Sequence, residues 1–150
     1  MYFCPKIAAM TFDILHKDTN CDCVGFAEED LDTLFARKIY KPFLREYDFR
    51  IKEDRSGNIL NCKQLCGLRG ISINIWNADS QEAIIQKYKT STNFSPKNRD
   101  SICVFKFNKN AGLTRHTPSN QDKFHYDFYK SDQFQMDNIE IQEILILKDT

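Results

Sequence analysis

The segment ISINIW, residues 71–76, indicates the fold class because it alternates apolar and polar side chains as a half-buried strand does. The preceding segment ILNCKQLCGL, residues 59–68, places its apolar residues and two cysteines on one helical face, and Gly67 or Gly70 can end that helix. Further apolar segments follow along the chain. They predict three more strands, at 101–107 (SICVFKF), 123–130 (KFHYDFYK) and 139–147 (IEIQEILIL).

The segments between these strands complete the prediction. Apolar residues recur every three to five positions between 24 and 47, which predicts a long helix that Pro42 ends or kinks. A short helix is expected at 6–15, a helix or turn at 78–89 and a loop at 108–122. The sequence therefore predicts one α+β domain (α/β/α-like) over residues 1–150, with helices packed on a central sheet of about four or five strands.

Composition and charge narrow the functional classes. The 150 residues contain 21 Lys and Arg against 21 Asp and Glu, so the formal net charge is zero. This balance argues against a nucleic-acid protein that works through a broad basic surface. The chain has neither an apolar run as long as a membrane span nor a start typical of a signal peptide. We therefore expect a monomer in the cytoplasm with no nucleic-acid or membrane partner.

Six cysteines, at positions 4, 21, 23, 62, 66 and 103, allow several kinds of chemistry. They could form disulfides, but a chain of this size in a reducing cytosol more often uses cysteines as free thiols, metal ligands or a nucleophile. Cys21 follows a polar turn and precedes the predicted helix. A thiol near a helix N-terminus is favoured as thiolate, and nearby backbone amides can stabilise an oxyanion.

A candidate general base lies about a hundred residues later, in FHYDFYK, residues 124–130. His125 can take a proton from a cysteine, and Asp127 can hold the imidazole in the required tautomer. Each residue has a simpler explanation when considered alone. His125 then serves as a structural histidine, and Asp127 as a solvated strand residue.

These motifs together resemble the ovarian tumour (OTU) family of cysteine proteases, most of which are deubiquitinases. Asp18-Thr19-Asn20-Cys21 looks like the family's Asp-Gly-Asn-Cys motif, and His125-Tyr126-Asp127 looks like its closing His-aromatic-Asp/Asn motif. The segments GNILNCKQLCGLRGISINIW (57–76) and FSPKNRDSICVFKFN (94–108) resemble the family's helix, following strand and next strand. The resemblance covers roughly residues 14–130.

The resemblance implies a papain-like OTU fold and a thiol protease. Cys21 would be the nucleophile, His125 the general base and then acid, Asp127 its orienting group, and Asp18 would shape the preceding loop. The amides around Thr19, Asn20 and Cys21 would form the oxyanion hole. The substrate would be a conjugate of ubiquitin or a ubiquitin-like protein, cut after its C-terminal Gly-Gly through a thioester without metal or cofactor. Residues 27–58 would supply part of the modifier-binding surface, and a viral or bacterial effector would act in host cytoplasm.

Three alternatives remain open from the sequence. Cys23 is a second candidate nucleophile. Thr19 and Asp22 depart from the family's pattern, so the protein can be an inactive OTU-like protein that binds ubiquitin. Finally, a zinc site can use four thiolates, which would exclude Cys21 as nucleophile; these are Cys21, Cys23, Cys62 and Cys66. No motif supports His16 or His116, which we expect at the surface or in a loop, and Trp76 is expected in the core or at its rim.

Overall fold

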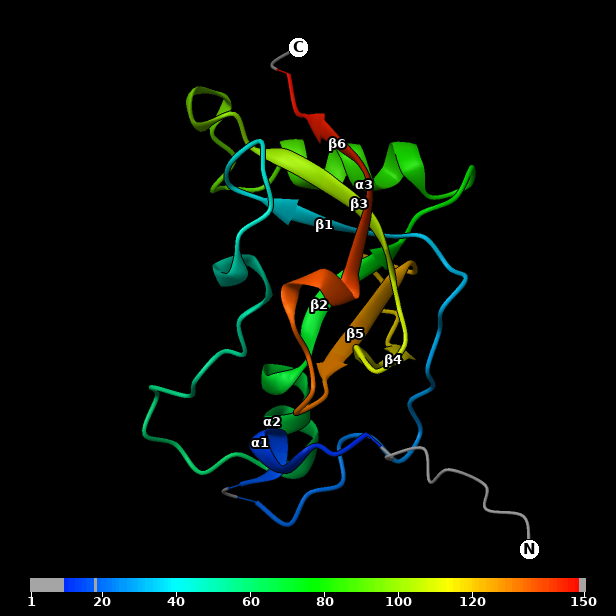
Figure 1. Cartoon of the computed structure of the whole chain (residues 1–150). Helices are drawn as coiled ribbons and strands as arrows, with labels where there is room; N and C mark the ends of the chain where they lie inside the picture. The colour runs from blue at the N-terminus through cyan, green and yellow to red at the C-terminus, as the bar shows by residue number, and fades with distance from the viewer. Residues whose placement is uncertain (1–9, 18, 149–150) are drawn as a thin grey trace, which may run out of the picture.

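The computed structural model describes residues 10–17 and 19–148, which form one antiparallel sheet with short helices around it (Figure 1). The six strands lie in the order β4-β5-β2-β1-β3-β6. The strands are β1 (Phe35–Ile39), β2 (Ile71–Ile75), β3 (Ser101–Phe107), β4 (Gly112–His116), β5 (His125–Lys130) and β6 (Ile139–Ile146). The helices are α1 (Asp13–His16), α2 (Cys62–Arg69), α3 (Gln81–Lys89) and the 3-10 turns η1 (Glu46–Phe49), η2 (Pro96–Asn98) and η3 (Met136–Asn138).

The apolar patterns in the second half of the chain predicted the elements well. The expected strands at 71–76, 101–107, 123–130 and 139–147 are confirmed as β2, β3, β5 and β6, and α2 and α3 lie within or beside the expected helical segments. The mixed helix and sheet class is likewise confirmed. The expected four or five strands were too few, because the structure has six.

The predicted long helix over residues 24–47 is wrong. That segment contains an isolated bridge between Glu28 and Thr114, and then strand β1, which pairs with β2 on one side and β3 on the other. Two of the apolar residues in that segment, Phe26 and Phe43, are 84% and 55% exposed and do not form the buried face that a helix would need. Five residues of β1 are too few to show alternation, and the strand is stabilised by partners far away in sequence.

The expected loop over residues 108–122 also contains a strand, β4, which pairs with β5. The polar sequence GLTRH gives little apolar signal because β4 lies at the edge of the sheet. Gly112 fits this position for a steric reason. A Cβ at residue 112 would overlap the carbonyl group of Tyr129, and its φ of +157° is unusual for other residues.

The core lies on both faces of the sheet. One face carries a cluster rich in phenylalanine, in which the Phe107 and Phe128 rings stack with centroids 4.1 Å apart. The other face is covered by α3, whose Ile84 and Tyr88 pack with Trp76. The prediction that Trp76 lies in the core or at its rim is confirmed, since it is 6% exposed.

Strands β1 and β2 pair over a short distance and then diverge (Figure 1). Their register contains only two residue pairs, Phe35 with Ile75 and Ala36 with Asn74. Beyond these pairs the Arg37 guanidinium bridges the strands, because its Nη1 donates to the Ser72 carbonyl oxygen at 2.6 Å. A groove therefore opens beside the centre of the sheet.

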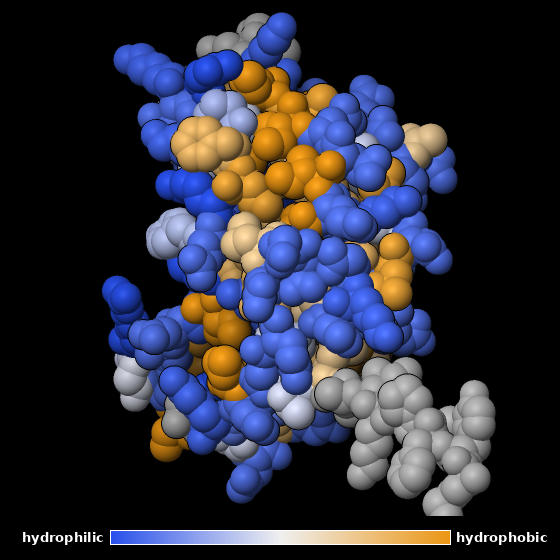
Figure 2. Space-filling model, in the orientation of Figure 1, coloured by the Kyte–Doolittle hydropathy of each residue, from blue (hydrophilic) through white to orange (hydrophobic). Residues whose placement is uncertain are grey.

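Strand β6, which forms the edge of the sheet opposite β4, exposes apolar side chains. Figure 2 shows an apolar band on the face where Figure 1 shows β6, and Ile141 and Ile146 of this strand are 47% and 38% exposed. In the part of the chain that the structure describes, no helix has the length and apolar character needed to cross a membrane.

Candidate functional site

Helix α2 presents two cysteines on one face. Its N-terminus has a capping box, in which the Asn61 side chain accepts from the Gln64 amide at 2.8 Å and the Gln64 side chain accepts from the Asn61 amide at 3.0 Å. Helix formation from this point places Cys62 and Cys66 one turn apart. The two sulfur atoms therefore point toward the same neighbouring segment.

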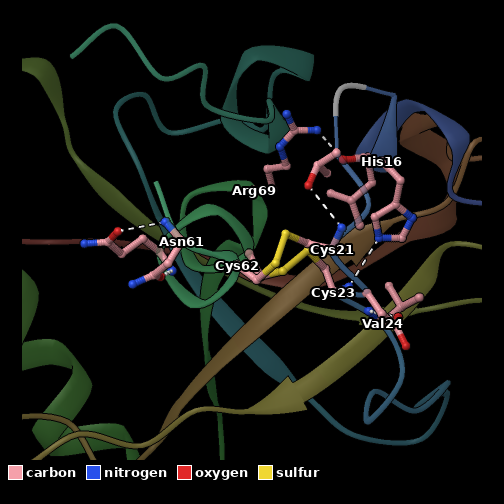
Figure 3. Close-up of a disulfide and its surroundings, with 12 residues drawn as sticks. His16, Cys21, Cys23, Val24, Asn61, Cys62 and Arg69 are labelled. Atoms are coloured by element: carbon pink, nitrogen blue, oxygen red, sulfur yellow. Dashed lines mark hydrogen bonds between the residues drawn. A yellow bond between two sulfur atoms is a disulfide. The ribbon is translucent and has the colours of Figure 1, made fainter. Parts of the chain in front are cut away.

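That neighbouring segment is the turn around residues 19–24, which presents Cys21 and Cys23 to α2 (Figure 3). The turn is held by local hydrogen bonds. The Cys21 amide donates to the Thr19 hydroxyl at 3.0 Å, and the Cys23 amide donates to the His16 ring at 3.3 Å. Arg69 of α2 provides an additional link, because its side chain donates a hydrogen bond to the Leu15 carbonyl oxygen in α1.

Cys21, Cys23, Cys62 and Cys66 lie together where the turn contacts α2. Cys21 forms a disulfide with Cys62, and Cys23 forms one with Cys66, with Cα atoms 5.4 and 5.2 Å apart. Both bridges join the same two segments, so the four sulfur atoms form one cluster. Cys23 and Cys66 pack in the small apolar cluster that also includes Tyr129.

The cluster changes the environment expected for the nucleophile. In the disulfide, the Cys21 sulfur has no thiol to ionise, and its amide is bonded to Thr19 and not directed at a substrate. The expected helix after Cys21 is absent, so the dipole argument for thiolate formation does not apply. Asn20 is exposed, and Asp18 lies outside the described residues.

His125 lies on β5 and its ring is fixed from both sides. Nδ1 lies 2.8 Å from the Thr117 hydroxyl and 3.1 Å from the Thr117 carbonyl oxygen, and Nε2 lies 3.1 Å from the Ser72 hydroxyl. A carbonyl oxygen only accepts, so this contact favours the tautomer with the proton on Nδ1. Nε2 can then accept a hydrogen bond from Ser72.

Asp127 lies two residues further along β5, on the same face as His125, and is 7% exposed. Burial raises the pKa of this carboxyl above its ordinary value, while His125, Thr117 and Arg115 act in the opposite direction. The end of α2 is close to it, since a Cβ at Gly70 would lie 2.8 Å from Asp127 Cβ. The carboxylate therefore occupies a dry position between β5 and α2.

The structure brings only part of the predicted catalytic set together. His125 and Asp127 are neighbours, whereas within residues 10–17 and 19–148 no hydrogen bond joins either of them to Cys21. Cys21 contacts the start of α2, and His125 contacts β2 and the residue after β4. A reaction between Cys21 and His125 would require reduction of the disulfide.

The other histidines have structural roles. His16 is partly buried against the cysteine turn, although a surface position was expected. His116 is exposed, stacks on Tyr126 at 4.7 Å and donates to the Lys123 carbonyl.

In the disulfide form, no group of three or more His, Cys, Asp or Glu side chains suited to a metal occurs among the described residues.

A basic groove of about 340 Å³, which the sequence did not predict, lies where β1 and β2 diverge. Its cations come from β1, from residues 50–52 and from α3, so no continuous sequence motif marks it. The lining residues are Arg37, Lys38, Tyr40, Arg50, Lys52, Ser72, Asn74, Lys87, Tyr88, Ser91 and Asn93.

Comparisons of this chain with protein-family models, with curated proteins and with solved structures found no match.

Proposed function

We propose that the chain is a metal-binding domain whose four clustered cysteines hold Zn²⁺ when they are reduced. The observation that carries the proposal is the convergence of Cys21 and Cys23 on Cys62 and Cys66. Zinc in structural sites takes four tetrahedral ligands, and thiolates at about 2.3 Å are common among them. Small shifts of side chains that already meet in pairs would surround one ion.

The compartment decides which form of the cluster is present. We expect the protein in the cytoplasm, where thiols are kept reduced and structural disulfides are rare. Four adjacent thiolates would repel one another there, and a divalent cation offsets that repulsion. In an oxidising compartment the two disulfides would hold the same segments together.

The cluster would act as a structural site. It joins the turn after α1 to α2, and α2 leads directly into the central strand β2. A metal that binds the folded chain more tightly than the unfolded chain adds its binding free energy to stability. The domain would therefore depend on zinc, or on the disulfides, to keep its N-terminal segment in place.

Metal content tests this proposal. The full chain is purified under reducing conditions with zinc present, desalted and analysed by elemental mass spectrometry. We expect about one zinc per chain, loss of zinc in Cys23→Ser and Cys66→Ser, and retention in Cys103→Ala, since the buried Cys103 lies outside the cluster. Folded, fully reduced protein without zinc would overturn the proposal.

An OTU-like thiol protease acting on ubiquitin conjugates is the second candidate, and the His125–Asp127 pair favours it. Asp127 lies close enough to His125 for the two groups to interact electrostatically, but Nδ1 of His125 is hydrogen-bonded to Thr117 and not to Asp127. This function needs Cys21 to be reduced, free of metal and within reach of His125. An inactive ubiquitin-binding protein would need none of these changes.

A ubiquitin C-terminal electrophile separates these candidates when it is added to reduced, chelator-treated protein. A mass shift lost in Cys21→Ala, kept in Cys23→Ala and weakened in His125→Ala would support the protease. Ubiquitin binding without a mass shift, unchanged in Cys21→Ala, would support the inactive protein. Neither result is expected if the cysteines serve only as zinc ligands.

A further inference from the structure

We propose that the groove between β1, β2 and α3 binds the phosphate group of a small phosphorylated molecule. This site is separate from the cysteine cluster and none of its lining residues is a cysteine, so the inference does not rest on the metal-binding function. It follows from the shape of the groove, from the charges that line it and from the hydrogen bonds those charges make.

The shape results from the early end of β1–β2 pairing. The paired register ends at Ala36 and Asn74, and the space beyond them is lined mainly by polar and charged side chains. α3 forms one wall through Lys87 and Tyr88, and residues 50–52 form another. The resulting volume of about 340 Å³ lies at the small end of the range for ligand sites.

The charge of the lining is one-sided. It includes five cationic side chains and no carboxylate: Arg37, Lys38, Arg50, Lys52 and Lys87. A chain with equal numbers of acidic and basic residues has no overall excess that would produce this grouping. Concave surfaces lined by one sign of charge raise the local concentration of the opposite ion.

Two of the cations are neutralised by nearby acids. Lys87 lies 2.5 Å from the Asp122 carboxylate, and Lys38 lies 3.7 Å from Asp100. Neither acid is among the residues that line the groove. They compensate for two of the five charges and leave an excess of positive charge in the groove.

Arg37 and Arg50 donate to backbone oxygens in place of carboxylates. Arg37 donates from Nε to the Asp48 carbonyl and from Nη1 to the Ser72 carbonyl, both at 2.6 Å. Arg50 donates to the Tyr47 carbonyl at 3.1 Å. Within the described part of the chain, neither guanidinium forms a salt bridge. Each retains donors for an anion.

Burial increases the benefit of an anionic ligand. Desolvation lowers the pKa of Arg37 below its ordinary value, while two tyrosines and Asp48 act in the opposite direction, so an anion in the groove would offset part of the cost of burying this charge. Phosphate oxygens accept charge-assisted hydrogen bonds, and arginine and lysine are the residues that proteins use for them. Ser91 and Asn93, which contact Lys38, add neutral polar groups at the same wall.

The dimensions favour a small molecule over a polynucleotide. A strand of nucleic acid needs a basic track over several phosphates, whereas these cations surround a single cavity. Tyr40, 37% exposed, is an aromatic ring in the lining that can contact the rest of the ligand. One or two phosphate groups fit this description.

Calorimetric titration with inorganic pyrophosphate tests the site, using the full chain in its disulfide form at low ionic strength. Failure of the zinc proposal therefore leaves this test unaffected. We expect saturable binding of one pyrophosphate per chain, weakened by added salt because the contacts are ionic. Binding without saturation at millimolar pyrophosphate would overturn the proposal.

Charge-removing variants locate the site. Arg50→Gln and Lys52→Gln change exposed side chains of the groove, and each should weaken pyrophosphate binding roughly tenfold, as expected for loss of a charged hydrogen bond. Lys109→Gln, an exposed lysine in the turn after β3, is the matched control and should leave binding unchanged. Equal weakening by all three variants, or tighter binding of a single-stranded oligonucleotide than of pyrophosphate, would refute a small-molecule phosphate site.

Discussion

The contribution of each disulfide to stability should depend on whether the other disulfide is present. The first bridge to form closes a long loop, since its cysteines are 41 residues apart for Cys21–Cys62 and 43 for Cys23–Cys66. In the chain-entropy description, a loop of this length stabilises the folded state by about 4 kcal/mol. The second bridge adds less, because the first already holds the two segments together.

The size of that second contribution follows from the connectivity. With one bridge present, the other closes a ring made of three residues from Cys21 to Cys23 and five from Cys62 to Cys66, eight in all. The same relation gives about 2.5 kcal/mol for a ring of this size. Removing either bridge alone should therefore cost about 2.5 kcal/mol, whereas removing both should cost about 6.5 kcal/mol.

Paired alanine variants measure this difference by urea unfolding without reductant. Cys21→Ala with Cys62→Ala removes one bridge, Cys23→Ala with Cys66→Ala removes the other, and the four substitutions together remove both. The combined loss should exceed the sum of the two single-bridge losses. The buried second pair will show an additional packing cost, since Cys23 is 1% exposed.

Two results would refute this reasoning. Unfolding free energies that are unchanged by either pair would mean that the bridges do not form in solution. A single pair that costs as much as all four substitutions would mean that the four cysteines act as one unit. The second result is what a zinc site predicts, because two remaining ligands do not hold the ion.

Three further predictions concern β5, α2 and the core. Asp127→Asn should stabilise the protein at pH 7. Because the pKa of Asp127 is raised in the folded state, the wild-type protein loses stability as pH rises from about 3.8 through the folded pKa. The stability advantage of Asp127→Asn over the wild type, measured by thermal unfolding, should therefore vanish at lower pH. Gly70→Ala should destabilise the protein by about 1–3 kcal/mol, because the added Cβ would contact Asp127. Gly67→Ala should stabilise α2 by up to about 1 kcal/mol, because a Cβ at this helical position has no atom within 4 Å. Urea unfolding measures both changes. Phe128→Ala should cost about 3–5 kcal/mol, and Phe26→Ala, at an 84% exposed position, less than about 0.5 kcal/mol; comparable losses would contradict the described core.

The sequence predicted those elements whose own residues carry the signal. β3, SICVFKF, is a continuous apolar segment that is buried over almost its whole length, and its predicted bounds of 101–107 match the structure. α2 has a capping residue and a suitable face within its own sequence. β1 differs because its stability comes from β2 and β3, which follow it by more than thirty residues. Local patterns cannot represent such partners.

The candidate sites divide in the same way. His125 and Asp127 lie on one face of β5, which is a local property of the strand, but the hydrogen bonds that orient the His125 Nδ1 come from Thr117. The predicted zinc alternative named all four clustered cysteines, although their pairing was not derivable from spacing alone. The basic groove was not predictable, because Arg37, Arg50 and Lys87 meet only through the divergence of two strands.

Ser72 connects the candidate base to the groove. Its hydroxyl lies 3.1 Å from Nε2 of His125, and the same residue lines the groove opposite Arg37. Cys21 has no such connection, because its disulfide holds it at the start of α2. A molecule held by the groove cations would lie beside Ser72, the residue whose hydroxyl contacts His125, whereas thiol chemistry at Cys21 would first require reduction of its disulfide. The cluster joins the N-terminal turn to α2, which leads into β2, and the groove is lined by Ser72 and Asn74 of β2 itself.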